Sequence, residues 1–407
     1  MVRVDADRPY PAFSAEEYEN REARVREMMD REGLDVLLVY GDSGTYHHDQ
    51  ANVHYLANYL GHGSAYVVFF ADPAEGATLF FEISNHREFA REMSVLDDVR
   101  WGGVPVAETV AERVQSGGAD GGRIGIVGRS MRDDKLVPHG HYRVFESDLR
   151  GELVDATAAF ERLRYVKSDE EIEFLRRGAE LTDRALEGLV DAVEPGVTEY
   201  ELKAALESAY LREGGLRFIS FFSSSSMTDP KPGECVPWHE ASRRRVERGD
   251  VVTTELSASY NGYPGQIHRP IAVGADPTDT YRDLFDVAGE TYENVVDALR
   301  PGNTARDVFE AAAPIVESEY HIDDPYVHGL GTTLQPPFVG TRESNYWPGH
   351  DDPVVDEWEF EENQTMVVQP NVITSDGRFG LQLGAAVVVR RGGAEILQDS
   401  PVEFIRV

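Results

Sequence analysis

Polar residues suited to catalysis gather in one stretch, residues 236–274, where a sheet core would normally be apolar. His239 opens this stretch, and Glu255, Gln266 and His268 follow within two β-rich runs. A histidine can move protons near neutral pH, and a carboxylate can act as a nucleophile or a general base. A carboxylate buried in a strand also needs hydrogen-bonding partners. We therefore interpret this stretch as the floor of an active site.

The first 160 residues alternate between helical and strand-like patterns. A charged helical run ends at Gly33. Four apolar, strand-like runs follow it, at residues 35–40, 65–70, 77–81 and 123–127. Strands that alternate with helices are typical of an α/β domain. We therefore predict a smaller α/β domain over residues 1–160.

The character of the chain changes just after residue 160. Ser168 stands three residues before Glu171, which is the pattern of a capped helix start, and Thr304 stands three residues before Asp307. Strand-like runs alternate with turns in the tail, at residues 365–369, 379–389 and 394–398. We predict an α+β domain over residues 161–407, with helices bracketing an antiparallel sheet.

Residues 219–247 have a loop-like composition, with serines at 223–226 and three nearby prolines. Two interpretations of the serine run stay open. It could be a low-complexity linker, or it could be a substrate loop, because loops beside rigid elements often carry function.

The charge of the chain restricts its partners. Lys and Arg number 39 against 73 Asp and Glu, which gives a formal net charge of −34. Such a charge repels nucleic acids and anionic membranes, so we expect neither as a partner. It also destabilises a compact fold unless salt screens it. We therefore expect a halophilic protein, although an acidic protein of an ordinary cytoplasm is the alternative.

Cys235 is the single cysteine, so no internal disulfide can form and a reducing compartment fits. Its position four residues before His239 allows a nucleophile, but a buried small apolar residue is the more common role. No apolar run is long enough to span a bilayer. We expect a soluble, cytoplasmic protein.

Several motifs in fixed order carry a resemblance to a known family. They are RYVKSDEEIEFLRRGAELTDRA at 164–185, His239, the spacing from Glu255 through Gly262-Tyr263 to Gln266, HGLG at 328–331, and MVVQP at 366–370. The chain resembles the pita-bread superfamily of aminopeptidase P, prolidase, methionine aminopeptidase and creatinase. The resemblance implies a C-terminal pita-bread domain that follows a creatinase-type N-terminal domain.

The resemblance also implies where metal ligands would stand. Family metallopeptidases hold two divalent ions with two aspartates, a histidine and two glutamates. The matching positions here are Glu255, Gln266, His328, Gln369, and either Gln382 or Gly384. One carboxylate remains, whereas hard divalent ions prefer several anionic oxygens. We therefore expect no metal and no other cofactor.

The precedent of the creatinase and ectoine hydrolase families implies a function without metal. We predict a metal-independent hydrolase of a C–N bond in a small polar or zwitterionic compound. In this scheme His239, Glu255 and His328 are catalytic. The substrate-binding residues would be Gln266, His268, Gln369 and Gln382. Structural roles stay open for His328, as a brace for a turn, and for His268, as a solvated strand residue.

Other functions remain open beside this one. A metal-dependent Xaa-Pro aminopeptidase or dipeptidase would be stimulated by manganese or cobalt. A non-catalytic peptide-binding module would show no turnover and would tolerate loss of His239. A lyase acting on a small sulfonium or betaine compound is a minor possibility. Family members with two such domains usually dimerise, so we expect a homodimer.

Overall fold

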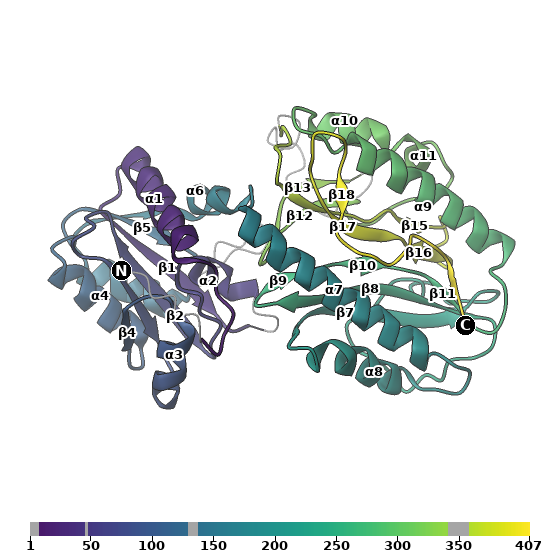
Figure 1. Cartoon of the computed structure of the whole chain (residues 1–407), viewed down its shortest axis with the longest axis horizontal. Helices are drawn as coiled ribbons and strands as arrows, with labels where there is room; N and C mark the ends of the chain where they lie inside the picture. The colour runs from purple at the N-terminus through teal and green to yellow at the C-terminus, as the bar shows by residue number, and fades with distance from the viewer. Residues whose placement is uncertain (1–7, 45–47, 129–136, 341–357) are drawn as a thin grey trace. The chain divides into compact units, whose positions relative to one another are not determined.

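The computed structural model describes residues 8–44, 48–128, 137–340 and 358–407 (Figure 1). The chain divides into two compact units, Met1–Tyr165 and Val166–Val407. The assignment of separate functional domains to residues 1–160 and 161–407 stays a prediction. Within the described residues, no helix is both long and apolar enough to cross a membrane.

A mixed sheet of six described strands forms the centre of the first unit, in the order β4-β3-β2-β1-β5-β6. The strands are β1 Val36–Asp42, β2 Ser64–Phe70, β3 Ala77–Phe81, β4 Asp98–Trp101, β5 Arg123–Val127 and β6 Glu152–Asp155. β1 is antiparallel to β2 and parallel to β5. The strand runs predicted at 77–81 and 123–127 match β3 and β5, and the other two differ from β1 and β2 by at most two residues at either end.

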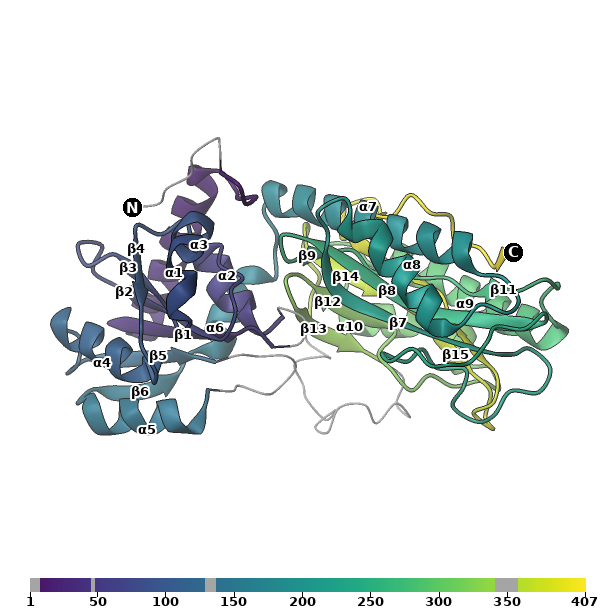
Figure 2. The ribbon, with the colours of Figure 1, turned by 90° about the horizontal axis from the view of Figure 1, so that it is seen from below.

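Helices cover both faces of this sheet. They are α1 Ala15–Glu32, α2 Ala51–Ala57, α3 Arg87–Met93, α4 Val106–Ser116, α5 His139–Asp148 and α6 Thr157–Glu161. Side chains alternate across a strand, so Leu37 and Val39 pack towards α1 and α2. Val36 and Leu38 pack towards α4 and α5 on the other face (Figure 2). A strand buried on both faces explains the unbroken apolar run that predicted β1.

The second unit is built on a larger sheet, with eleven described strands. The main path is β13-β12-β14-β17-β10-β8-β11-β19, while β7 and β9 pair with β8, and β18 pairs with β17. The strands are β7 Leu216–Ser226, β8 Asp250–Tyr260, β9 Tyr263–Pro264, β10 Ile267–His268, β11 Ile271–Ala272, β12 Val327–Leu330, β13 Leu334–Val339, β14 Thr365–Val368, β17 Gly384–Val388, β18 Glu395–Ile396 and β19 Ile405–Arg406. A separate ribbon pairs β15 Asn371–Ile373 with β16 Gly380–Gln382.

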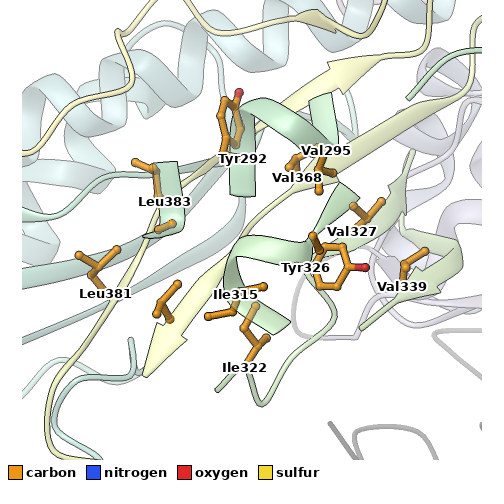
Figure 3. Packing of buried hydrophobic residues seen from close by; sticks show 14 of the residues in the cluster. Tyr292, Val295, Ile315, Ile322, Tyr326, Val327, Val339, Val368, Leu381 and Leu383 are labelled. Atoms are coloured by element: carbon orange, nitrogen blue, oxygen red, sulfur yellow. The ribbon is translucent and has the colours of Figure 1, made fainter. Parts of the chain in front are cut away.

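Two groups of helices pack on this sheet. They are α7 Asp169–Ala192, α8 Glu199–Leu211, α9 Asp279–Ala298, α10 Ala305–Ala311 and α11 Ala313–Val316. α7 and α8 share a buried apolar cluster with β7 and β8. A second cluster joins α9, α10 and α11 to β14 and β17, and Tyr292, Ile315 and Val368 are among its members (Figure 3). Each fully buried aliphatic side chain in such a cluster contributes roughly 1.5–3 kcal/mol.

Helix starts follow the predicted caps. Ser168 and Glu171 form a reciprocal capping box at the start of α7. Thr304 and Asp307 form another at the start of α10. Together with the mostly antiparallel sheet, these helices confirm the predicted α+β class of the second unit.

The predicted loop over residues 219–247 is wrong in its first part. Residues 219–226 belong to β7, where Ser223 pairs with Thr253 and Ser226 pairs with Asp250. The serines are compatible with a strand because the hydroxyls of Ser223, Ser224 and Ser226 have hydrogen-bond partners there. Ser223 Oγ, for example, donates to the carbonyl oxygens of Glu234 and Val236, both at 3.0 Å.

Candidate functional site

Neighbouring strands of the larger sheet carry the polar residues singled out in the sequence. Glu255 lies in β8, and His268 lies in the adjacent β10, two residues after Gln266. β10 also pairs with β17, which pairs in turn with β14. Gln369 directly follows β14, and His328 lies in the next strand, β12. The sheet therefore brings together residues that are far apart in the sequence.

The side-chain amide of Gln266 lies at the centre of this group. Its nitrogen is within hydrogen-bonding distance of three acceptors: Glu255 Oε1 at 3.3 Å, Gln369 Oε1 at 3.2 Å and His268 Nε2 at 3.3 Å. Gln266 and His268 are fully buried, whereas Glu255 is partly exposed. The opposite amide orientation would turn an oxygen towards these acceptors, so the contacts determine which way Gln266 points.

His268 joins Gln382 to the same group. Its Nδ1 lies 3.1 Å from Gln382 Oε1, and an amide oxygen only accepts, so Nδ1 carries the hydrogen. Burial is the main cause that lowers the pKa of His268 to about 3; the hydrogen bond to Gln382 opposes this shift, and the neighbouring charges of His328 and Arg269 add to it. His268 is therefore neutral at physiological pH. The alternative of a solvated strand residue is wrong, because His268 is fully buried.

Backbone groups hold Gln369 and His328. Gln369 Nε2 donates to the carbonyl oxygen of Pro325 at 3.1 Å, which leaves Oε1 for Gln266. His328 Nδ1 lies 3.0 Å from the carbonyl oxygen of Gly329, and its ring packs at 6.3 Å from that of Phe338. A catalytic role for His328 stays a prediction.

His239 is more exposed than the buried members of this group. Its side chain is 40% exposed, and its ring lies 4.4 Å from the ring of Trp238 and 6.0 Å from that of Phe221. Phe221 is the strand partner of Glu255 in the β7–β8 pair. The register therefore connects the His239 ring to the strand position opposite Glu255, while the predicted proton transfer between the two stays untested.

Glu199 fixes the segment that follows His239. Its Oε1 accepts from the backbone nitrogen and Oγ of Ser224 at 3.0 and 2.7 Å, and its Oε2 accepts from the same two groups of Ser242 at 3.0 and 2.6 Å. This buried carboxylate thus ties β7 to the chain three residues beyond His239. Sequence reasoning missed Glu199, because an acidic residue after the N-cap Thr198 is an ordinary helix start.

Two further buried residues adjoin the site and were also missed. Arg269 donates to the carbonyl oxygens of His268 and Gly384, at 2.8 and 2.7 Å, and so holds β10 against β17. The available signal was a charged residue inside a β-rich run. Asn371 pairs with Gln382 across the β15–β16 ribbon, and neither polar atom of its buried side chain has a hydrogen-bond partner in the described parts of the chain. No sequence signal marked Asn371.

The thiol of Cys235 is not suited to nucleophilic attack. The residue is buried, and burial raises the pKa of its thiol to about 11. A thiol with this pKa stays protonated near neutral pH, whereas the thiolate is the nucleophile. The expected role of a small buried apolar residue fits this environment.

The described donor set does not fit a pair of divalent ions. Across residues 8–44, 48–128, 137–340 and 358–407, no group of three or more His, Cys, Asp or Glu side chains could hold a metal. The oxygens of Glu255 and Gln369 that could serve as ligands instead accept hydrogen bonds from Gln266. Hard divalent ions prefer anionic oxygens, and one carboxylate cannot balance two such ions.

Each of the two units matches a known protein family. Residues 173–391 match the profile described as "Metallopeptidase family M24", and residues 21–166 match "Creatinase/Prolidase N-terminal domain". An Xaa-Pro dipeptidase of Pyrococcus furiosus is 29% identical, over 60% of this chain and 66% of that protein. An Xaa-Pro dipeptidase of Pyrococcus horikoshii is 23% identical, over 94% of this chain and 97% of that protein.

A solved structure shows the same fold. The Xaa-Pro dipeptidase from Bacillus anthracis superimposes with a TM-score of 0.76 at 23% identity, covering 96% of this chain and 100% of that one. The predicted pita-bread fold with its creatinase-like N-terminal domain is confirmed.

These findings correct the predicted function. The main prediction was a metal-independent hydrolase of a C–N bond in a small polar compound. This prediction is wrong, because the similar proteins are named Xaa-Pro dipeptidases and residues 173–391 match a metallopeptidase family. That prediction depended on the number of carboxylates near Glu255. The number of carboxylates at a site affects how well the site binds cations, but it does not identify the substrate.

Proposed function

Because this chain belongs to metallopeptidase family M24 and carries a creatinase/prolidase N-terminal domain, we propose that it hydrolyses dipeptides whose second residue is proline. The observation that carries the proposal is the similarity to an Xaa-Pro dipeptidase over 94% of the chain. The polar cluster around Gln266 is the proposed binding site, because its residues stand at the positions that match the family's motifs.

The chain's own residues suit a small, partly apolar substrate. The exposed part of the His239 ring and the 61% exposed Trp238 offer an aromatic surface against which a proline ring can pack. Glu255 supplies the carboxylate of the cluster and is its partly exposed member. We assign substrate contact to His239 and Glu255, and positioning of the buried cluster to Gln369 and Gln382.

A direct test is a turnover assay on a panel of dipeptides in concentrated salt. Alanyl-proline and leucyl-proline would be compared with alanyl-alanine, each with a chelator and with added manganese or cobalt. We expect selective cleavage of the proline dipeptides. Absence of cleavage under every metal condition would reject the proposal.

One observation favours a second candidate, a module that binds such peptides without cleaving them. An amide N–H, rather than a ligand oxygen, occupies the centre of the site. Calorimetric titration with alanyl-proline separates the two, because this candidate requires binding without turnover. In either case we propose a homodimer in the cytoplasm, and light scattering of the full chain tests its size.

A further inference from the structure

Two side chains of α8 hold the segment that begins at His239. Glu199 and Lys203 are four residues apart on this helix, so their side chains project from the same face. Glu199 accepts hydrogen bonds from the backbone nitrogen and Oγ of Ser242. Lys203 Nζ lies 3.4 Å from the carbonyl oxygen of His239 itself. The two side chains therefore hold the beginning and the end of the segment from His239 to Ser242.

The ammonium group of Lys203 also connects α8 with β7. Nζ donates to the carbonyl oxygen of Ser220, and Glu207 Oε1 lies 3.7 Å away as an ion-pair partner. An ammonium group carries three hydrogens, and two carbonyl oxygens and one carboxylate face this one. Burial is the main cause that lowers the pKa of Lys203; the Glu207 carboxylate opposes this shift, and the charge of Arg217 adds to it. The contact with His239 thus lies in a partly buried setting, where water competes less for the hydrogen bond.

The two peptide groups that flank the Cα atom of His239 are each held by a neighbouring element. The carbonyl oxygen of Trp238 belongs to the preceding peptide group, and it accepts from the backbone nitrogen of Phe222 in β7 at 3.2 Å. The carbonyl oxygen of His239 belongs to the following peptide group, and it accepts from Lys203. Peptide groups are planar, so holding both of them fixes the backbone dihedral angles of His239. The direction of its Cα–Cβ bond is fixed as a result.

We propose that Lys203 is a positioning residue, which sets the direction of the His239 side chain by holding the peptide group that follows it. The inference rests on the proposed function, in which His239 contacts the substrate, and it adds a residue that acts through the backbone. Displacing a reacting group by about 1 Å can lower a rate by about 100-fold. A contact of this kind can therefore affect turnover while the fold stays intact.

Turnover of alanyl-proline by Lys203→Met and Lys203→Arg, each in the full chain, tests the proposal. Methionine keeps an unbranched side chain but has no hydrogen to donate, whereas arginine keeps the charge and the donors. We expect kcat/KM to fall by about 10- to 100-fold in Lys203→Met and to recover to within about threefold in Lys203→Arg. Lys231→Met is the matched control, because the side chain of Lys231 is 83% exposed and pairs with Glu234. It should keep full turnover.

The NMR signal of the His239 ring measures the position of this ring without turnover. The rings of Trp238 and Phe221 lie 4.4 and 6.0 Å from it, so their ring currents shift the signal by an amount that depends on the geometry. Loss of the signal in His239→Ala identifies it. We expect the signal to move towards that of a free histidine in Lys203→Met and to return in Lys203→Arg.

The two measurements separate failure of this proposal from failure of the proposed function. An unchanged His239 signal in Lys203→Met would overturn the positioning role, whatever the turnover. A shifted signal with full turnover would overturn it as well, because the position of the ring would then not matter for the reaction. If the unaltered chain cleaves no dipeptide, the proposed function fails, whereas a shift that Lys203→Arg reverses still supports the hold on His239. If Lys203→Met does not fold, Lys203→Gln, which is uncharged and keeps a donor, takes its place with smaller effects expected in both measurements.

Discussion

At the scale of single residues, Glu255 supplies the negative charge among the neutral side chains of Gln266, His268, Gln369 and Gln382. Its Oε1 lies 3.3 Å from the amide nitrogen of Gln266. Glu255→Gln keeps the shape and removes the charge, so we expect kcat/KM on alanyl-proline to fall by about 100-fold or more. The melting temperature should change little, because a neutral amide can keep a hydrogen bond in this partly exposed position. Unchanged turnover in this variant would show that Glu255 has no role in the proposed reaction.

The amides at this site also make a residue-scale prediction about metal. Gln266→Asp combined with Gln369→Glu places three carboxylates where the chain has one. Anionic oxygens are the ligands that hard divalent ions prefer, so we expect manganese affinity to rise by at least about tenfold over the unaltered chain. Titration calorimetry with MnCl₂ measures this change. Equal affinities in the two proteins would show that these positions do not form a cation site.

At the scale of elements, Glu199 connects the start of α8 with β7 and with the segment after His239. It accepts hydrogen bonds from Ser224 and Ser242 through both oxygens. Glu199→Gln can keep acceptors at one oxygen only, so we expect a loss of about 1–3 kcal/mol in the free energy of unfolding. Urea denaturation measures it. Glu201→Gln is the control, because Glu201 belongs to the exposed capping box of the same helix and its substitution should destabilise the protein clearly less than Glu199→Gln.

Local sequence patterns predicted the elements wherever the determining contacts are local. The caps at Ser168 and Thr304 depend on side chains three residues apart, and both were recognised in the sequence. The serine run of β7 was mistaken for a loop because the carboxylate that accepts from Ser224 comes from α8. Propensity within a short window contains no information about such a partner.

The difference between local contacts and contacts between distant segments also applies to the candidate site. The resemblance to family motifs supplied the positions of Gln266, Gln369 and Gln382, and the structure brings them together with His268. The direction of each amide and the tautomer of His268 depend on contacts between strands separated by about a hundred residues, so the sequence could not predict them. Asn371 was missed for the same reason, since only its pairing with Gln382 connects it to the site.

At the scale of the whole molecule, the net charge of −34 should make the stability depend on the salt concentration. Repulsion between carboxylates opposes the compact state, and salt reduces it because the screening length falls from about 10 Å at 0.1 M to about 3 Å at 1 M. Ion pairs on the described surface are mostly short-range arginine pairs such as Arg184 with Glu187, which contribute little each. We therefore expect the melting temperature to rise steadily between about 0.1 and 2 M KCl.

Salt can stabilise this protein by screening the repulsion between its carboxylates, which depends on charge. A solute that is merely excluded from the protein surface stabilises proteins whatever their charge. Sucrose at equal osmolality stabilises proteins by exclusion from the surface and leaves the repulsion unchanged. The expected result is a rise in melting temperature with KCl that clearly exceeds the rise with sucrose. A melting temperature that is flat or falls with KCl would contradict the expected halophilic character and favour an acidic protein adapted to ordinary ionic strength. The comparison also fixes the salt concentration at which the dipeptide assays report on a folded protein.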